Sequence, residues 1–315
     1  MRRPIVSGPL EMTPELGPSL LACRPMFPRR AVCVSRDEGV RRVVGEALAS
    51  AGLDVRYAET LPSSSETDGA AVIVVDRATR QACADVLRSL TSPVVVVGDD
   101  LDDDGLITLM LEHPVSHLVG DPADPDLGIT SEKLASGDVF GLEKYLDAGS
   151  KVGERVIRSE AEKKNAIDEV VAWAEAIGAR RPIIHRITSV VDELLMNAMR
   201  IDYESGQQRA VLRWGSDGKT VAISVGDGFG ALSQRDVIDH VRRARLERGR
   251  PQDKHESDGA GLGLYLVLAN VASLIVNVAP GHETEVVCLF DLVRPSRRGA
   301  VLGTVRSLHV FNAAN

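Results

Sequence analysis

The stretch DELLMNAMRID, residues 192–202, is the part of the sequence on which the fold prediction rests. Its apolar residues recur at the spacing of an amphipathic helix. Residues four apart share a helix face, so Glu193 and Asn197 lie together, with Arg200 three positions further on. A carboxylate can accept a proton, an amide oxygen can bind a hard metal, and a guanidinium can hold a phosphate. An isolated face of this kind is more often a solvated surface, so the downstream sequence decides its interpretation. The expected buried stripe is Leu194, Leu195, Ala198, Met199 and Ile201.

Two glycine-rich stretches and a hairpin pattern follow this helix. In residues 221–232, VAISVGDGFGAL, alternating apolar residues predict a strand that ends at Asp227. In residues 258–268, DGAGLGLYLVL, a run of spaced glycines opens an apolar helix. Residues 276–292 predict a hairpin that turns at Pro280-Gly281 and has Thr284 at the head of its last strand. The four patterns follow one another within about a hundred residues, which makes their combination much more specific than any one of them.

In this order the patterns resemble the Bergerat-fold ATP-binding domain of the GHKL superfamily, which includes gyrase-type ATPases, histidine kinases and anti-sigma-factor kinases. The resemblance covers roughly residues 151–292. It implies an α/β sandwich that binds ATP and Mg²⁺. Glu193 matches the residue that polarises the attacking water or hydroxyl, and Asn197 matches the asparagine that binds Mg²⁺. The positions implied to bind the nucleotide are Asn197, Arg200, Asp227, Gly228, Gly230, Gly259, Gly261, Leu262, Gly263 and Thr284.

The adenine-binding motif departs from the pattern of the family. The usual order is an acid, one residue, and then the first glycine. Here Gly228 directly follows Asp227, and Phe229 takes the middle position. We therefore expect Asp227 to accept a hydrogen bond from the adenine amino group, Thr284 to support the same edge, and one wall of the pocket to be more apolar.

The N-terminal half, residues 30–126, alternates β-branched apolar runs with helical patterns, which predicts a doubly wound parallel sheet. It resembles a two-component receiver domain with Asp76 at the phospho-acceptor position. Arg36 stands where one magnesium-binding acid is expected, Gly98 replaces a serine or threonine, and Asp121 replaces a lysine. We therefore predict a degenerate receiver that serves protein contacts. In that reading, Asp76 caps the turn that follows its strand.

The remaining segments complete the expected domain organisation. Residues 1–29 are expected to be a flexible leader, 127–150 a linker or docking segment, and 294–315 a C-terminal extension with one added strand or hairpin. Residues 151–293 form the expected ATP-binding domain, opening with a long charged helix over 151–178. Residues 233–258 are expected to begin with a helix over 234–245 and to form a cationic lid over the phosphates.

Composition places the chain among ordinary soluble proteins. Its 315 residues are 44% hydrophobic and 26% charged, and the net charge of −8 argues against a general nucleic-acid binder. The four cysteines have no metal-ligand spacing, which is typical of a reduced cytosol. No apolar run approaches the roughly 18 residues that a membrane span needs. We therefore expect a cytoplasmic protein that contacts neither membrane nor nucleic acid.

Three functions are compatible with these patterns. The first is an ATP-dependent serine kinase or regulator of the anti-sigma type. It would act on a sigma factor, an antagonist or another signalling protein, with Glu193 as the base for the incoming hydroxyl. The second is a non-catalytic switch in which ATP changes a partner surface, and the third is a plain ATPase. The sequence leaves the oligomeric state open, with a homodimer as one option.

Overall fold

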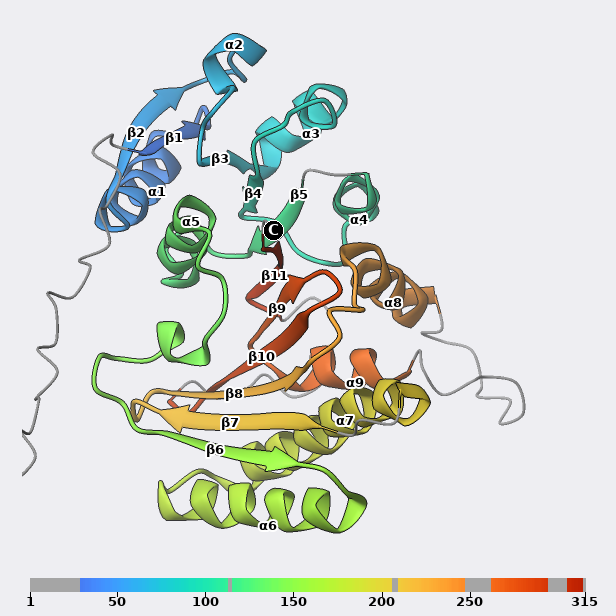
Figure 1. Ribbon diagram of the computed structural model, residues 1–315. Coiled ribbons are helices and arrows are strands. Elements are labelled where there is room, and N and C mark those ends of the chain that lie inside the picture. The colour runs from blue at the N-terminus through green and yellow to red at the C-terminus, as the bar shows by residue number, and fades with distance from the viewer. Residues whose placement is uncertain (1–28, 113–114, 206–208, 247–261, 294–304, 314–315) are drawn as a thin grey trace, which may run out of the picture.

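The computed structural model describes residues 29–112, 115–205, 209–246, 262–293 and 305–313. Their strands form a single 11-stranded sheet in the order β2-β1-β3-β4-β5-β11-β9-β10-β8-β7-β6 (Figure 1). The strands are β1 (Arg29–Val34), β2 (Leu53–Ala58), β3 (Val72–Asp76), β4 (Val94–Val97), β5 (Val115–Val119), β6 (Val152–Ile157), β7 (Ala210–Ser216), β8 (Thr220–Asp227), β9 (Ser273–Ala279), β10 (Glu283–Asp291) and β11 (Ser307–Asn312). The helices are α1 (Glu38–Ser50), α2 (Ser64–Thr67), α3 (Arg77–Leu87), α4 (Asp104–Leu111), α5 (Asp126–Ser136), the short 3₁₀ helix η1 (Leu142–Tyr145), α6 (Glu160–Ala176), α7 (Arg181–Ser205), α8 (Gln234–Leu246) and α9 (Leu262–Asn270). The predicted α/β fold class is confirmed.

The N-terminal half is a parallel sheet in the order β2-β1-β3-β4-β5. This is the flavodoxin-like doubly wound order, which many proteins other than receivers share. Helices α1 and α5 cover the face that carries Ala31 and Cys33, and α3 and α4 cover the face that carries Val32 and Val34. Both faces are therefore buried, which explains the continuous runs of β-branched residues in β3 and β4.

The C-terminal half is a mixed sheet with helices on one face, the α/β sandwich that the sequence predicts. Its strands β6, β7, β8, β10 and β9 pair antiparallel, and the helices α6, α7, α8 and α9 pack on one face. Part of the opposite face is covered by η1 and the residues before it, where Leu142 and Tyr145 pack against the sheet. Residues alternate along each strand between the helix-covered face and this second face.

The last strand, β11, lies in the middle of the sheet and connects the two halves. It pairs antiparallel with β5 and parallel with β9 (Figure 1). Asp126, at the first position of α5, accepts hydrogen bonds from the hydroxyls of Ser273 and Ser307. A strand in the C-terminal extension was expected from its β-branched residues. Its insertion between the two halves was not.

The prediction of one helix over residues 151–178 is wrong for its first part. Residues 152–157 form the edge strand β6, and the helix α6 begins only at Glu160. Val152 and Val156 are four apart and fit a helix, but Gly153 packs under Trp214, where a Cβ atom would lie 2.6 Å from the ring. Ser159 caps α6 by accepting a hydrogen bond from the Glu162 amide. The sequence SEAE at this point is a capping-box pattern that marks the true start of the helix.

The segment expected as a linker contains the helix α5 and the short helix η1, both packed against neighbouring elements. Helix α5 lies against α1 of the N-terminal half, and η1 lies against β7 and β8 of the C-terminal half. The sequence analysis also assigned no element to residues 104–111, which form α4. The domain boundaries themselves stay a prediction. Among the described helices, none combines the length and the apolar character needed to cross a membrane.

Two buried histidines at the junction predict a loss of stability in acid. Burial, together with the charge of Lys133, lowers the pKa of His117 from 6.5 to about 3, and burial also lowers the pKa of His309 well below 6.5. Between pH 6.5 and 3 the unfolded chain binds protons that the folded chain excludes. The free energy of unfolding should therefore fall with falling pH, by up to about 1.4 kcal/mol per pH unit for each histidine.

Urea unfolding at a series of pH values measures this slope. A double variant, His117→Phe with His309→Phe, should unfold with a shallower pH dependence below pH 6.5. His185→Gln, an exposed position on α7, is the matched control and should keep the wild-type slope. An unchanged slope in the double variant would contradict the assignment of acid sensitivity to this pair.

Candidate functional site

Helix α7 carries the predicted phosphate-facing residues. Glu193 and Asn197 lie one turn apart and are half-buried, whereas Leu194, Leu195, Ala198 and Met199 are buried. The amphipathic helix predicted from residues 192–202 is thus confirmed for the described side chains. Asp192 forms an ion pair with Lys163 of α6 at 2.9 Å, which fixes α7 against its neighbour. The side chains of Arg200 and Ile201 lie outside the described residues.

The beginning of helix α9 lies directly against Glu193. A Cβ atom added to Gly263 would come within 1.7 Å of the Glu193 carboxylate, so only glycine fits beneath that side chain in its present position. The first turn of a helix has free N–H groups and a partial positive charge. The structure therefore brings the carboxylate of α7 to the helix start that the sequence assigns to the phosphates. Gly259, Gly261 and the side chain of Leu262 lie outside the described residues.

Asp227 and Thr284 form the second part of the site. Asp227 ends β8, Thr284 is the second residue of β10, and the two are paired in register. They share the side of the sheet that carries Val225 and Val278, which pack into the core beneath the helices. The Thr284 side chain is buried, and its hydroxyl has no hydrogen-bond partner among the described residues. Buried hydroxyls normally have a hydrogen-bond partner. The Thr284 hydroxyl has none among the described residues, and it lies where the sequence predicts adenine.

The turn after Asp227 explains the unusual glycine pattern. The Asp227 carboxylate accepts a hydrogen bond from the Phe229 amide at 2.9 Å, which closes an Asx-type turn. Gly230 has φ +60°, and a Cβ atom there would lie 2.0 Å from the carbonyl oxygen of Ala279. Gly230 is therefore required where the turn packs on the β9–β10 hairpin. Gly228 has open space around it. Contacts of Gly228 and Gly230 with nucleotide stay a prediction.

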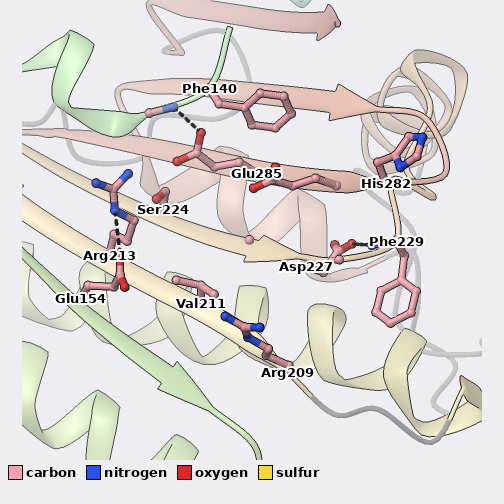
Figure 2. Close-up of a pocket in the computed structure, with 14 residues that line it drawn as sticks. Phe140, Glu154, Arg209, Val211, Arg213, Ser224, Asp227, Phe229, His282 and Glu285 are labelled. Carbon is pink, nitrogen blue, oxygen red and sulfur yellow. Dashed lines mark hydrogen bonds and ion pairs between the residues drawn. The ribbon is translucent and has the colours of Figure 1, made fainter. Parts of the chain in front are cut away.

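A cavity of about 560 Å³ lies on the other face of the same strands (Figure 2). Figure 2 shows side chains from β6, β7, β8 and β10 around it, with Phe140 closing one side and Phe229 near the turn. The sequence analysis did not identify this cavity. The signal was present as polar residues at alternate positions of otherwise apolar strands: Arg213 in β7, Ser224 in β8, and Glu283 and Glu285 in β10.

At the carboxyl edge of the N-terminal sheet, Asp76 is held by its own neighbours. Its carboxylate accepts hydrogen bonds from the Ser35 hydroxyl and from the Thr79 amide, so it caps α3. Nearby, the buried Arg80 guanidinium donates to Asp99 at 2.6 Å. Capping is thus the role that Asp76 has in this structure, as the sequence analysis expected.

The match to a protein family decides the nature of the C-terminal half. A family described as histidine kinase-like ATPase domain matches residues 158–288. Residues 158–288 form a histidine kinase-like ATPase domain. The matched segment begins just before α6, contains α7, β8 and α9, and ends within β10. The ATPase domain therefore includes every predicted nucleotide-site residue from Glu193 to Thr284, and it makes up less than half of the chain.

Solved structures give weaker similarities. A crystal structure of the SiaB–SiaC complex from Pseudomonas aeruginosa is 15% identical, with a TM-score of 0.34, and covers 44% of this chain and 88% of that chain. A fungal multi-domain GH3 β-N-acetylglucosaminidase with a GCN5-related glucosamine N-acetyltransferase region is 13% identical, with a TM-score of 0.28, and covers 75% of this chain and 31% of that one. At these scores neither similarity supports an argument about function. The comparison with curated proteins gives no match.

We predict that Asp76 does not accept a phosphoryl group. Its oxygens are engaged by Ser35 and Thr79, and Arg36 and Asp121 replace the residues that would hold magnesium and the phosphoryl oxygen. Incubation with acetyl phosphate or beryllofluoride, followed by intact mass spectrometry or crystallography, tests this prediction. Asp76→Asn, which keeps the helix cap, is the matched control. A stoichiometric adduct on wild type that the variant lacks would show a working receiver instead.

Proposed function

We propose that the ATPase domain binds Mg-ATP between α7, α9 and the helix-covered face of β8 and β10. The observation that carries this proposal is the buried, unpartnered hydroxyl of Thr284, paired in register with Asp227. A carboxylate and a hydroxyl side by side at a strand end can accept and donate hydrogen bonds along the edge of an adenine ring. The contact between Glu193 and Gly263 supports a phosphate end of the site one helix away.

The side chains of α7 have separate roles in this proposal. The amide oxygen of Asn197 would bind Mg²⁺, and bound Mg²⁺ would offset charge on the phosphate groups. The Glu193 carboxylate, at the start of α9, would accept the proton of an incoming hydroxyl. Neither residue has a hydrogen bond from its side chain to the other described residues, which leaves both available to a ligand.

The activity that follows is phosphoryl transfer to a hydroxyl of a partner protein, as in anti-sigma-type serine kinases. His185 is exposed on α7 about two helical turns before Glu193, so the proposal does not use it as a phosphoryl acceptor. The partner would be a sigma factor, an antagonist or another signalling protein. The alternatives remain a non-catalytic switch and a plain ATPase, and the role of Glu193 separates them.

Nucleotide binding is tested by calorimetry with Mg-ATP. Asp227→Asn should weaken binding by about 1–3 kcal/mol, because it leaves a buried adenine donor poorly paired. Thr284→Val should also weaken binding. The same change should leave the free protein as stable as wild type or more so, because it removes an unsatisfied buried hydroxyl. Asn197→Ala should reduce the dependence of binding on Mg²⁺.

Asp54→Asn, an exposed position on β2, is the matched control and should bind ATP as wild type does. The site is wrongly assigned if wild type fails to bind ATP with Mg²⁺, or if all three site variants bind as wild type does.

Glu193→Gln should retain ATP binding and lose most turnover or phosphotransfer. The substitution keeps the shape of the side chain and removes the base, and general-base assistance contributes a factor of about 10²–10⁴. Single-turnover assays with labelled ATP, with and without candidate partners, measure the rate. Glu175→Gln on the exposed face of α6 is the matched control.

Equal rates for wild type and Glu193→Gln would remove Glu193 from the catalytic role. Negligible turnover by wild type, combined with ATP-dependent binding of a partner by both proteins, would favour the non-catalytic switch. Turnover that no candidate partner changes, with no phosphorylated partner, would favour the plain ATPase.

A further inference from the structure

The cavity on the second face of the ATPase sheet exists because residue 226 is a glycine. Gly226 of β8 is in register with Val211 of β7 and Glu285 of β10. A side chain at this position would project into the cavity, because Gly226 shares its strand face with Ser224. Because Gly226 has no side chain, the backbone of β8 forms the floor of the cavity between the side chains of Val211 and Glu285. Phe140 closes one wall (Figure 2). The volume of about 560 Å³ is in the range of small-molecule sites.

Two buried polar groups at the bottom of this cavity have unused hydrogen-bonding capacity. Ser224 is 1% exposed, and its hydroxyl has no hydrogen bond with the described residues. Glu285 is 5% exposed. One of its carboxylate oxygens accepts from the Gly141 amide at 2.8 Å and from the Asn277 side chain at 3.0 Å. Its other oxygen receives no donor from the described residues. This oxygen is open to the cavity and can accept a hydrogen bond from a ligand that donates.

The charge of the lining points to a positive ligand. Glu283 lies next to Glu285 on the same face, and the pKa of Glu283 is raised by burial and then by the charges of Glu285 and Asp227. The Arg213 guanidinium is already paired with Glu143 at 3.1 Å and with Glu154 at 3.4 Å.

Lys133 reaches Glu285 only through the amide of Asn277, and burial lowers the pKa of Lys133 to about 7. The described residues therefore offset the negative charge of Glu285 only in part. Arg209, at the rim, has interactions of its own. Negative charge dominates at the cavity floor.

We propose that this cavity is a second binding site for an organic cation: a primary ammonium or guanidinium group on a short apolar stem. It lies on the sheet face opposite the proposed ATP site, and the two sites meet at Asp227 and Gly228. The cation donates hydrogen bonds to the free oxygen of Glu285 and to Ser224. The stem packs against Val211 and Phe140, and the aromatic ring adds a cation–π attraction. Carboxylate or phosphate ligands are disfavoured by Glu283 and Glu285.

The same chemistry has two sources. One is a free small amine or guanidine, and the other is a lysine or arginine side chain of a partner protein. Both place the same charged group on Glu285. They differ in what lies outside the cavity, where a partner would continue past Phe229 and His282 at the rim.

Matched probes test the charge requirement on the full-length protein. Butylguanidinium and butylammonium should bind saturably, followed by calorimetry or by NMR shifts of the Ser224 and Gly226 amides. Butanol and butyrate have a similar stem without the positive charge and should bind at least about tenfold more weakly, since hydrogen bonds to charged groups contribute about 1.5–3 kcal/mol. Equal binding of butanol, preference for butyrate, or no saturable binding of either cation would overturn the proposal.

Two variants locate the site. Gly226→Val fills the floor, and its Cβ meets no atom closer than the 3.4 Å contact with the Thr284 carbonyl oxygen, so the backbone accepts it. Glu285→Gln removes the charge and keeps an acceptor for Gly141 and Asn277. Each should weaken cation binding about tenfold or more. Glu46→Gln, exposed on α1, is the matched control. Unfolding curves confirm that each variant is folded. If both folded variants bind the cation as wild type does, the cation binds elsewhere and the proposal is overturned.

A further pair of probes separates the two sources. N-acetyl-arginine methylamide presents the side chain with a peptide backbone, and agmatine presents the same guanidinium as a free small molecule. Tighter binding of the blocked amino acid favours a partner side chain, and tighter binding of agmatine favours a free amine. Either outcome supports the site if Glu285→Gln weakens binding of the probe. If neither Glu285→Gln nor Gly226→Val weakens binding, the proposal is contradicted.

Discussion

The fold depends on pairing two strand edges that would otherwise be open. Strand β5 ends the parallel sheet of the N-terminal half, and β9 ends the mixed sheet of the ATPase half. An unpaired buried edge leaves a row of N–H and C=O groups unsatisfied. Strand β11 satisfies both edges at once, with Leu308 in register with Leu118 on one side and Leu274 on the other. The two halves therefore share one sheet.

A buried lysine fixes this junction. Lys133 of α5 is 1% exposed, donates hydrogen bonds to Tyr145 and Asn277, and lies 4.0 Å from the centre of the Phe311 ring in β11. A buried ammonium is costly unless it is paired and hydrogen-bonded, so these partners must stay in place together. Asn277 then donates to Glu285 at the floor of the cavity. One series of hydrogen bonds thus joins α5 to the second face of the ATPase sheet, and the cation–π contact with Phe311 adds the last strand.

The two faces of β8 and β10 carry different chemistry because successive side chains of a strand point to opposite sides. Asp227 and Thr284 belong to the helix-covered face, where α7 and α9 bring Glu193 and Gly263 together. Ser224 and Glu285 belong to the other face, beneath Phe140. The proposed ATP site and the proposed cation site are therefore back to back, with Asp227 at the shared strand end.

The sequence by itself determined the main elements that carry the predicted nucleotide-site residues. Helical spacing located α7 with its buried Leu194 and Leu195, and alternation located β8 and the hairpin around Gly281, because these patterns are local. Only the tertiary structure decided what depends on distant partners. The spacing of Val152 and Val156 fits a helix, but both lie in a strand because the segment pairs with β7. The position of β11 is set by the edges of β5 and β9, with which it pairs. The cavity also needed the fold, because Gly226, Glu285 and Phe140 become neighbours only when separate strands and a connecting segment are brought together.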